Sequence, residues 1–403
     1  MHVPDGFFNA VTSISAGVVA AAGVAVCLRG ARRELDDRTA PMAGLVAAFI
    51  FAVQMLNFPV AAGTSGHLMG GALAAILVGP YTGVLCMAVV LLVQSVFFAD
   101  GGLTALGVNI TIMGIVTVLA GWGVFRLVTR VAGGKVAVAA FLAALVSVPA
   151  AALVFTLLFW IGGTAPIEVG TVAAAMGGVH LLIGVGEGLI TAVTVGAVLA
   201  VRPDLVYGAR GLTRPLLLRD AEGTTTTTTA TAGTTATAGT TATTDTTATA
   251  GAAASAIEGA GKPVGGRGPL RPFLLGGAGV TLVLAGLVSF VASSSPDGLE
   301  AVAENEGFID RATGHLFGEW ALADYGEVGG IPVGVAGIIG VGLVLLVAGA
   351  VAHAARSRDT SRDTSRDTSR DTSRDTSRDA TLDQPRDQVR DDTQGRAHGE
   401  TRA

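Results

Sequence analysis

The first two residues, Met1 and His2, place an imidazole directly behind the amino terminus of the chain. If the amine of Met1 is free, a primary amine, a deprotonatable amide nitrogen and an imidazole can close two small chelate rings around one metal ion. A fourth nitrogen would complete a square plane, the geometry that Ni(II), Cu(II) and low-spin Co(II) accept. The bulk of His2 disfavours removal of Met1. The alternative is that Met1 is only the start residue and His2 a solvated side chain.

A second histidine, His67, ends a Gly-Thr-Ser-Gly turn between two apolar segments. With Met1 and His2 it would supply four nitrogen donors, a set too poor in oxygen for Mg²⁺ or Ca²⁺. Met1, His2 and His67 are therefore the candidate metal ligands, and the alternative for His67 is a structural role at a membrane interface. Asp100, in an Asp-Gly-Gly turn, is expected to cap the next helix or to brace an imidazole ligand.

His180 and Glu187 lie seven residues apart, so they share one face of a long apolar segment. Glu187 is the only carboxylate well inside the apolar segments of the first 201 residues, and an ionisable group within a membrane is a functional candidate. The alternative is a buried Glu187 that fixes helix packing by hydrogen bonds to neighbours such as Gln54, Gln94 or Asn109. The sequence leaves the roles of His180 and Glu187 open.

The composition decides which class of fold must position these residues. The chain has 403 residues, of which 50% are hydrophobic and 14% charged, and its mean hydropathy is +0.60. Such values indicate an integral membrane protein, and several apolar segments reach the roughly 20 residues that a helix needs to cross a bilayer. The two cysteines, Cys27 and Cys86, both fall in apolar segments and support neither a disulfide nor a metal site. No basic residue precedes the first apolar run, so no cleavable leader is expected.

The basic loops predict how the apolar segments cross the membrane. The clusters at 29–38, 126–135 and 202–214 should lie in the cytoplasm. An even number of crossings must then separate Arg38 from Arg126, which requires a break at Gly79-Pro80 and a short, shielded first half. The amino terminus, His67 and Asp100 then share the outer side. We expect seven spans in this part of the chain, at about 10–28, 41–60, 67–79, 80–98, 103–124, 136–161 and 169–201.

The rest of the chain is predicted to add a two-helix module, so the fold class is an all-α, polytopic membrane bundle. Two further apolar segments, about 272–292 and 331–352, flank an acidic loop. A Thr/Ala/Gly-rich stretch before them and a Ser-Arg-Asp-Thr repeat after them are predicted to be disordered. The expected boundaries are 1–219 for the first membrane domain, 220–266 for the linker, 267–355 for the second module and 356–403 for the tail.

Nucleotide hydrolysis is not expected of this chain. The nearest match to a phosphate-binding loop, residues 259–263, lacks the first glycine spacing and the hydroxyl. The charges sit in loops and tails, which predicts the lipid bilayer and no nucleic acid as a partner. We therefore expect no enzyme activity and no catalytic cofactor, and any active transport would draw its energy from another subunit.

Four motifs that occur in order resemble the substrate-binding membrane (S) subunit of energy-coupling factor (ECF) transporters for cobalt and nickel, the CbiM/NikM type. The motifs are Met1-His2-Val3-Pro4-Asp5-Gly6, Gly66-His67-Leu68, the stretch 94–109 and the stretch 180–191. The resemblance covers about residues 1–201. It implies a metal ion held in a square plane by the amine of Met1, the backbone nitrogen and imidazole of His2, and the imidazole of His67.

The acidic loop Ser295-Pro296-Asp297-Gly298-Leu299-Glu300, between two spans, resembles the auxiliary N component, a PDGLE module of the CbiN/NikN type. Both components are then fused in one chain. The resemblance implies a transmembrane coupling (T) subunit and ABC-type ATPase subunits as partners. The linker and the tail match nothing in the family pattern.

The expected function is the capture of Co²⁺ or Ni²⁺ as a transported substrate outside a bacterial cell membrane, and its delivery inward when ATPase partners reorient the protein. The amino terminus would lie outside, and the linker and tail in the cytoplasm. One alternative is a secondary permease driven by an ion gradient, with Glu187 and His180 as a relay. Another is a structural membrane protein that transports nothing. Cobalt, with a role in cobalamin synthesis, and nickel both stay open, because four nitrogen donors suit either metal.

Overall fold

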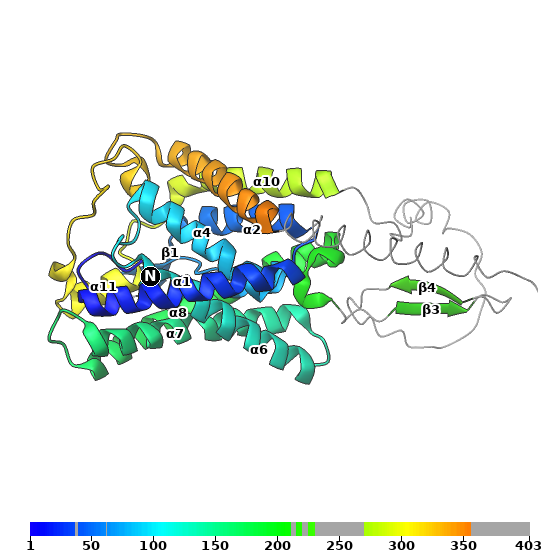
Figure 1. Cartoon of the computed structure of the whole chain (residues 1–403), viewed down its shortest axis with the longest axis horizontal. Coiled ribbons are helices and arrows are strands. Elements are labelled where there is room, and N and C mark those ends of the chain that lie inside the picture. The colour runs from blue at the N-terminus through cyan, green and yellow to red at the C-terminus, as the bar shows by residue number, and fades with distance from the viewer. Residues whose placement is uncertain (37–38, 62, 211–214, 220–224, 230–269, 356–403) are drawn as a thin grey trace, which may run out of the picture. The chain divides into compact units, whose positions relative to one another are not determined.

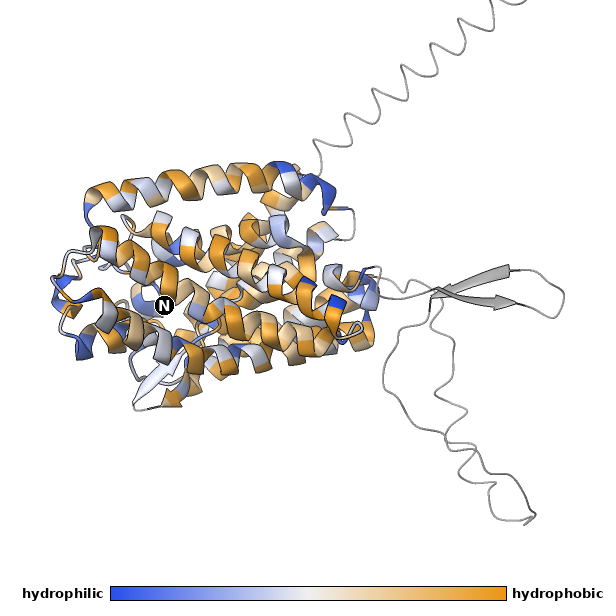
Figure 2. Cartoon of the chain, turned by 90° about the horizontal axis from the view of Figure 1, so that it is seen from below, coloured by the Kyte–Doolittle hydropathy of each residue, from blue (hydrophilic) through white to orange (hydrophobic). Residues whose placement is uncertain are grey.

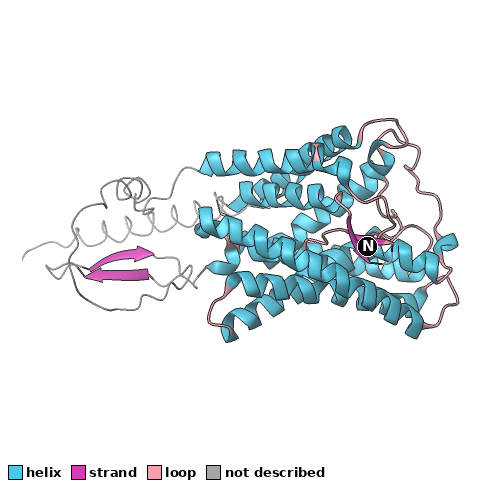
Figure 3. Cartoon of the chain, turned by 180° about the vertical axis from the view of Figure 1, so that it is seen from behind, coloured by secondary structure: helices cyan, strands magenta, loops and turns pink. Residues whose placement is uncertain are grey.

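The computed structural model describes residues 1–36, 39–61, 63–210, 215–219, 225–229 and 270–355 (Figure 1). Most of these residues are helical (Figure 3), and the predicted all-α membrane bundle is confirmed. Seven described helices are long and apolar enough to cross a membrane. They are Ala10–Arg33, Pro80–Phe98, Leu106–Val131, Val136–Gly162, Val169–Val201, Leu270–Val291 and Val333–Ala355.

The elements of the first module follow the predicted order. Its helices are α1 (Ala10–Gly30), α2 (Thr39–Gln54), α3 (Gly71–Val78), α4 (Pro80–Phe98), α5 (Leu106–Asn109), α6 (Thr117–Val131), α7 (Val136–Gly162) and α8 (Val169–Val201). A π-helical turn, Ile110–Val116, joins α5 to α6, so these three form one span. Hydrophobic residues cover the helices, and hydrophilic ones gather near their ends (Figure 2).

The break predicted at Gly79-Pro80 is present. Gly79 adopts a φ of 99°, which favours glycine, and Pro80 is the first residue of α4, where its missing N–H costs nothing. The short helix before the break, α3, has only eight residues, and all of them are buried. It is shorter than the predicted 67–79 half because the chain stays non-helical from His67 to Gly70.

A β-hairpin replaces the end of the second predicted span. Helix α2 stops at Gln54, and β1 (Phe58–Ala61) pairs antiparallel with β2 (Thr64–Gly66). Pro59 lacks the N–H that a continued helix needs, and Gly63 takes the positive φ of 76° at the turn. The hairpin leads directly into His67, so it positions a candidate ligand.

The second module packs along the first one. Its elements are α10 (Leu270–Gly286), α11 (Gly298–Asn305) and the helix Val333–Ala355. Helix α10 contacts α2, and α11 contacts α8. A Cβ on Gly44 of α2 would come within 3.5 Å of the Gly349 backbone, so small residues allow this close approach.

Most of the predicted linker and all of the predicted tail lie outside the described residues. Within the linker, Thr225–Thr229 form strand β4, which pairs antiparallel with β3, Pro215–Arg219.

Candidate metal centre

The amino-terminal tail is inserted into the bundle and held there by hydrogen bonds to its backbone. Met1 and Val3 are buried. The N–H of Val3 donates to Oδ1 of Asn109 at 2.9 Å, and Nδ2 of Asn109 donates back to the Val3 carbonyl at 3.1 Å. The N–H of Gly102 also donates to this carbonyl, at 2.8 Å. Asn109 therefore fixes the tail two residues beyond the amine.

Farther along the tail, Asp5 anchors the turn before α5. Its carboxylate accepts hydrogen bonds from the N–H of Leu103 at 3.2 Å and from the N–H of Thr104 at 2.7 Å. The N–H of Thr164 donates to the Phe7 carbonyl at 3.0 Å. Together with the contacts of Val3, these hydrogen bonds tie the tail to the turn 102–104, to Asn109 and to Thr164. The position of the amine is therefore determined by the bundle.

The amine of Met1 meets His67, as predicted. Its nitrogen lies 2.5 Å from Nε2 of His67, whose side chain is 4% exposed. Nδ1 of His67 lies 3.0 Å from the Leu68 carbonyl, which can only accept a hydrogen bond. Nδ1 therefore carries a proton in this arrangement, and Nε2 faces the amine.

His2 lies beside His67, with their rings stacked at a centroid distance of 4.9 Å. Nδ1 of His2 lies 3.1 Å from Asp100, and Nε2 lies 3.3 Å from Oε1 of Gln94. Burial, which outweighs the opposing charge of Asp100, lowers the pKa of His2 to about 4. The ring is therefore neutral at pH 7, the form that coordinates metals. Of the two roles expected for Asp100, the structure shows contact with an imidazole.

The structure adds a residue that the sequence did not assign to the site, Asp297 of the second module. Its Oδ2 lies 2.8 Å from the Met1 amine and 3.6 Å from Nε2 of His67. Burial alone would raise the pKa of Asp297, but the Met1 ammonium and His67 together hold it well below its usual value. Asp297 also caps α11 in a capping box with Glu300. The capping pattern is visible in the sequence, but its position beside Met1 is not.

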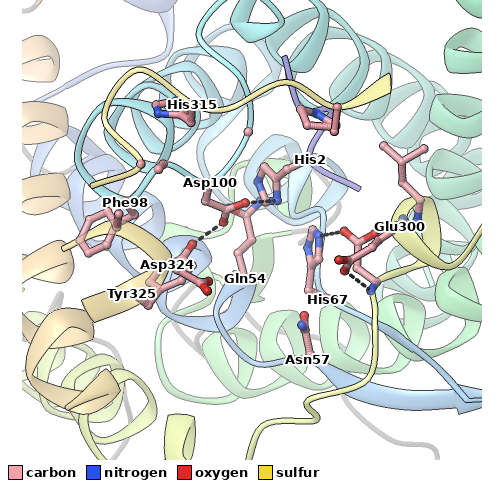
Figure 4. Close-up of a pocket in the computed structure, with 18 of the residues that line it drawn as sticks. His2, Gln54, Asn57, His67, Phe98, Asp100, Glu300, His315, Asp324 and Tyr325 are labelled. Atoms are coloured by element: carbon pink, nitrogen blue, oxygen red, sulfur yellow. Dashed lines mark hydrogen bonds and ion pairs between the residues drawn. The ribbon is translucent and has the colours of Figure 1, made fainter. Parts of the chain in front are cut away.

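A cavity of about 550 Å³ opens beside these residues. Both modules line it, and Figure 4 shows the side chains converging on it. The hydroxyl of Tyr325 donates to Asp100 at 2.5 Å and accepts a hydrogen bond from Nε2 of Gln94 at 3.2 Å. The charged or titratable residues that line the cavity are His2, His67, Asp100, Asp297, Glu300, His315, Asp324 and Tyr325.

No cluster of three or more His, Cys, Asp or Glu side chains in the described part of the chain is arranged to hold a metal ion. The candidate set differs from such clusters because it depends on a terminal amine and a backbone nitrogen. The structure brings the amine and His67 together, and it places the ring of His2 next to them with Nδ1 turned toward Asp100.

Residues 2–205 match the family described as the cobalt uptake substrate-specific transmembrane region, CbiM, and residues 271–357 match the PDGLE domain. The chain belongs to the CbiM family. It is thus a membrane component of metal transport with a PDGLE module in the same chain.

Several metal transport proteins are similar to the CbiM region of this chain. A putative metal transport protein of Haloquadratum walsbyi is 41% identical over 51% of this chain and 94% of its own length. A putative fused nickel transport protein of Archaeoglobus fulgidus is 42% identical over 51% of this chain and 68% of its own. A cobalt transport protein of Sorangium cellulosum is 36% identical over 51% of this chain and 94% of its own.

The two ionisable residues of α8, His180 and Glu187, are both completely buried, but they contact different groups. The carboxylate of Glu187 accepts the N–H groups of Met69 at 2.7 Å and Gly70 at 3.1 Å. His180 donates from Nδ1 to the Met176 carbonyl at 2.8 Å, and its Nε2 has no hydrogen-bond partner among the described residues.

The alternative of a buried, hydrogen-bonded Glu187 agrees with the structure, but its partners are backbone groups and not Gln54, Gln94 or Asn109. Gln54 donates to the Met69 carbonyl, Gln94 contacts His2 and Tyr325, and Asn109 holds Val3. The N–H groups just before α3 have no partner within their own helix, and they bind the carboxylate instead.

Proposed function

We propose that this protein captures Ni²⁺ or Co²⁺ as the substrate-binding subunit of an ATP-driven ECF importer. The ligands are the amine of Met1, the backbone nitrogen and imidazole of His2, and Nε2 of His67. The observation that carries the proposal is the burial of the tail, which holds the Met1 amine 2.5 Å from Nε2 of His67.

Capture requires a small rearrangement of groups that are already adjacent. The amine loses its proton, the His2 amide is deprotonated, and the His2 ring turns so that Nδ1 leaves Asp100 for the metal. The resulting set of four nitrogens suits a square plane. Asp100 and Asp297 stay near the ion and offset its charge.

The surroundings favour tight but reversible binding. Met1, Val3 and His67 are buried, and the lower polarity around them strengthens the attraction between the ion and its ligands. The cavity provides a path for the metal, and carboxylates along that path attract a cation. Nitrogen donors do not select between the two metals, and relatives are named for both cobalt and nickel.

Transport in this proposal depends on partners. The energy in this proposal comes from ABC-type ATPase subunits through a coupling subunit, as the resemblance to ECF importers implies. The basic loops orient the amino terminus to the outside, where it meets the metal.

Metal retention by the purified protein tests the capture step. After gel filtration in detergent, the wild-type protein should retain about one equivalent of Ni²⁺ or Co²⁺. The variants H2A and H67A, and a variant with two residues added before Met1, should retain none. Equal retention in all four proteins would contradict the proposed ligand set.

Uptake by cells tests the energy source. Accumulation of radioactive Ni²⁺ or Co²⁺ should require co-expression of the coupling and ATPase subunits. Uptake that persists without them would favour a secondary permease, and a wild-type protein that retains no metal would favour a structural role.

A further inference from the structure

Glu187 is a carboxylate buried within the long apolar helix α8. Its side chain is 0% exposed, and it forms no ion pair within the described parts of the chain. Burial of a carboxylate is costly unless several donors stabilise it. Its two oxygens each accept one backbone N–H, from Met69 and Gly70, immediately before α3.

One of these peptide groups also contacts His67. The Leu68–Met69 peptide donates its N–H to Oε2 of Glu187 at 2.7 Å. The carbonyl of the same peptide accepts a hydrogen bond from Nδ1 of His67 at 3.0 Å. A single rigid peptide plane therefore joins the carboxylate to the imidazole, and the other nitrogen of that imidazole faces the Met1 amine.

The next peptide group is fixed in the same manner. The Met69–Gly70 peptide donates its N–H to Oε1 of Glu187 at 3.1 Å, and its carbonyl accepts Nε2 of Gln54 at 2.9 Å. Gly70 has a φ of 86°, a left-handed conformation that favours glycine, and it is the residue that joins this turn to α3. Gln54 is itself buried.

We infer that Glu187 is a positioning residue for His67 and acts through the Leu68–Met69 peptide. This inference rests on the proposed role of His67 as a metal ligand. The carboxylate fixes the peptide that fixes the ring, and its charge polarises that peptide so that the carbonyl is a stronger acceptor for Nδ1–H. A stronger bond at Nδ1 makes Nε2 a better donor to a metal, as carboxylates bound directly to ligating histidines do.

The chain offers a matched control in Glu34. It is also a buried carboxylate, and it accepts the N–H groups of Tyr81 at 3.2 Å and Thr82 at 2.7 Å at the start of α4. Glu34 binds N–H groups that follow the carboxyl end of α3, whereas Glu187 binds N–H groups that precede the amino end of α3. E34Q and E187Q each replace a buried carboxylate that accepts two backbone N–H groups, and only the carboxylate of Glu187 is linked to His67.

The test measures the affinity and spectrum of Ni²⁺ bound to the full-length wild-type, E187Q and E34Q proteins. E187Q should weaken Ni²⁺ binding by about 10–100-fold. It should also shift the visible absorption band of the bound Ni²⁺, because the energy of that band follows the strength of the nitrogen donors. E34Q should keep the wild-type affinity and band, even if its melting temperature falls.

A second variant keeps the test decisive if E187Q does not fold. Q54L leaves the neighbouring peptide without its donor, and it should weaken Ni²⁺ binding by about fivefold, the equivalent of one hydrogen bond. If E187Q does fold, the losses of Ni²⁺ affinity from E187Q and Q54L should not add in the double variant, because both act on the same turn.

Three results would overturn the inference. The first is wild-type affinity and an unshifted band in E187Q. The second is an equal loss of affinity in E34Q, which would show a general effect of instability. The third is a loss of transport in E187Q with unchanged Ni²⁺ binding, the result expected of a proton relay.

A wild-type protein without bound Ni²⁺ would reject the proposed function itself, and H2A would then show no further loss of Ni²⁺ binding.

Discussion

The contact between Asp297 and the Met1 amine joins the PDGLE module to the candidate ligands at the scale of single atoms. In the metal-free protein the carboxylate faces an ammonium group at 2.8 Å. When a metal replaces the amine proton, the same carboxylate faces a divalent ion nearby. The attraction to a charge of two exceeds the attraction to a charge of one, so Asp297 should favour the metal-bound state.

We therefore expect D297N to weaken Ni²⁺ binding by about tenfold, a loss typical of groups that support metal ligands. Asparagine keeps the cap of α11, so the fold should be preserved. Competition with a coloured chelator measures the affinity. E304Q, at an exposed carboxylate of the same helix, is the control. Tighter binding in D297N would show that Asp297 instead holds the amine in its protonated form.

The buried ring of His2 predicts how acid affects the metal-free protein. The unfolded chain takes up a proton below about pH 6.5, whereas folded His2 stays neutral until about pH 4. More protons then bind to the unfolded state, so the free energy of unfolding should fall as pH drops through this window, by up to about 3 kcal/mol. Denaturant unfolding in a chelator at pH 7 and pH 5 covers the upper part of this window, where the expected loss is about 2 kcal/mol. H2N should lose most of this dependence, and an unchanged dependence would reject the assignment.

Residue types predicted part of this site. Met1, His2 and His67 could be assigned from their donor atoms and from the parity of the spans, and the structure places them together. Asp297 could not be assigned, because it is 296 residues from Met1 and meets it only through docking of the second module. The backbone partners of Glu187 could not be predicted, because backbone N–H groups leave no pattern in the sequence.

At the scale of elements, the turn between α4 and α5 determines where the tail can lie. Gly102 donates to the Val3 carbonyl and packs against Asp5. A Cβ at Gly102 would lie 2.3 Å from the Asp5 nitrogen, a backbone atom that cannot move without displacing the tail. The absence of a side chain at this position is therefore a requirement of the site.

G102A should destabilise the protein by about 1–3 kcal/mol, because the added methyl group overpacks the turn. It should also weaken metal retention, since the displaced tail carries the amine. Thermal unfolding and metal content after gel filtration measure the two effects. G177A provides the control, because no atom lies within 4 Å of a Cβ at that position of α8. A G102A protein that keeps full metal content would separate tail packing from binding.

The sequence predicted most elements but not the β1–β2 hairpin. Apolar length and Gly79-Pro80 were sufficient for the helices, because each span must satisfy its own backbone inside a bilayer. The hairpin depends on tertiary contacts. Its residue Ser65 donates from its N–H to the Pro296 carbonyl at 2.9 Å and from its hydroxyl to the Ser295 carbonyl at 2.7 Å. Such pairing between distant segments has no local signature.

At the scale of the whole molecule, the two modules share one apolar core and one polar end. Buried Ala336, Val341 and Val344 of the last helix belong to the same core as Phe51 of α2. Tyr325 stacks on Phe98 at a centroid distance of 5.1 Å. Backbone pairing adds to this contact, because the N–H of Ser293 donates to the Asn57 carbonyl at 2.8 Å. Two modules that bury this much together do not need a covalent tether to stay associated.

A protease site placed between residues 230 and 266 tests this conclusion. After cleavage, the CbiM and PDGLE fragments should copurify in mild detergent, and the Ni²⁺ affinity should stay within about twofold of the uncut protein. The linker otherwise only raises the effective concentration of one module near the other, to the millimolar range. The uncut wild-type chain exposed to the same protease is the control. Adding D297A and Y325F should promote separation, because both variants remove polar contacts between the modules. If cleavage alone separates the fragments and releases the metal, the tether is an essential part of the site.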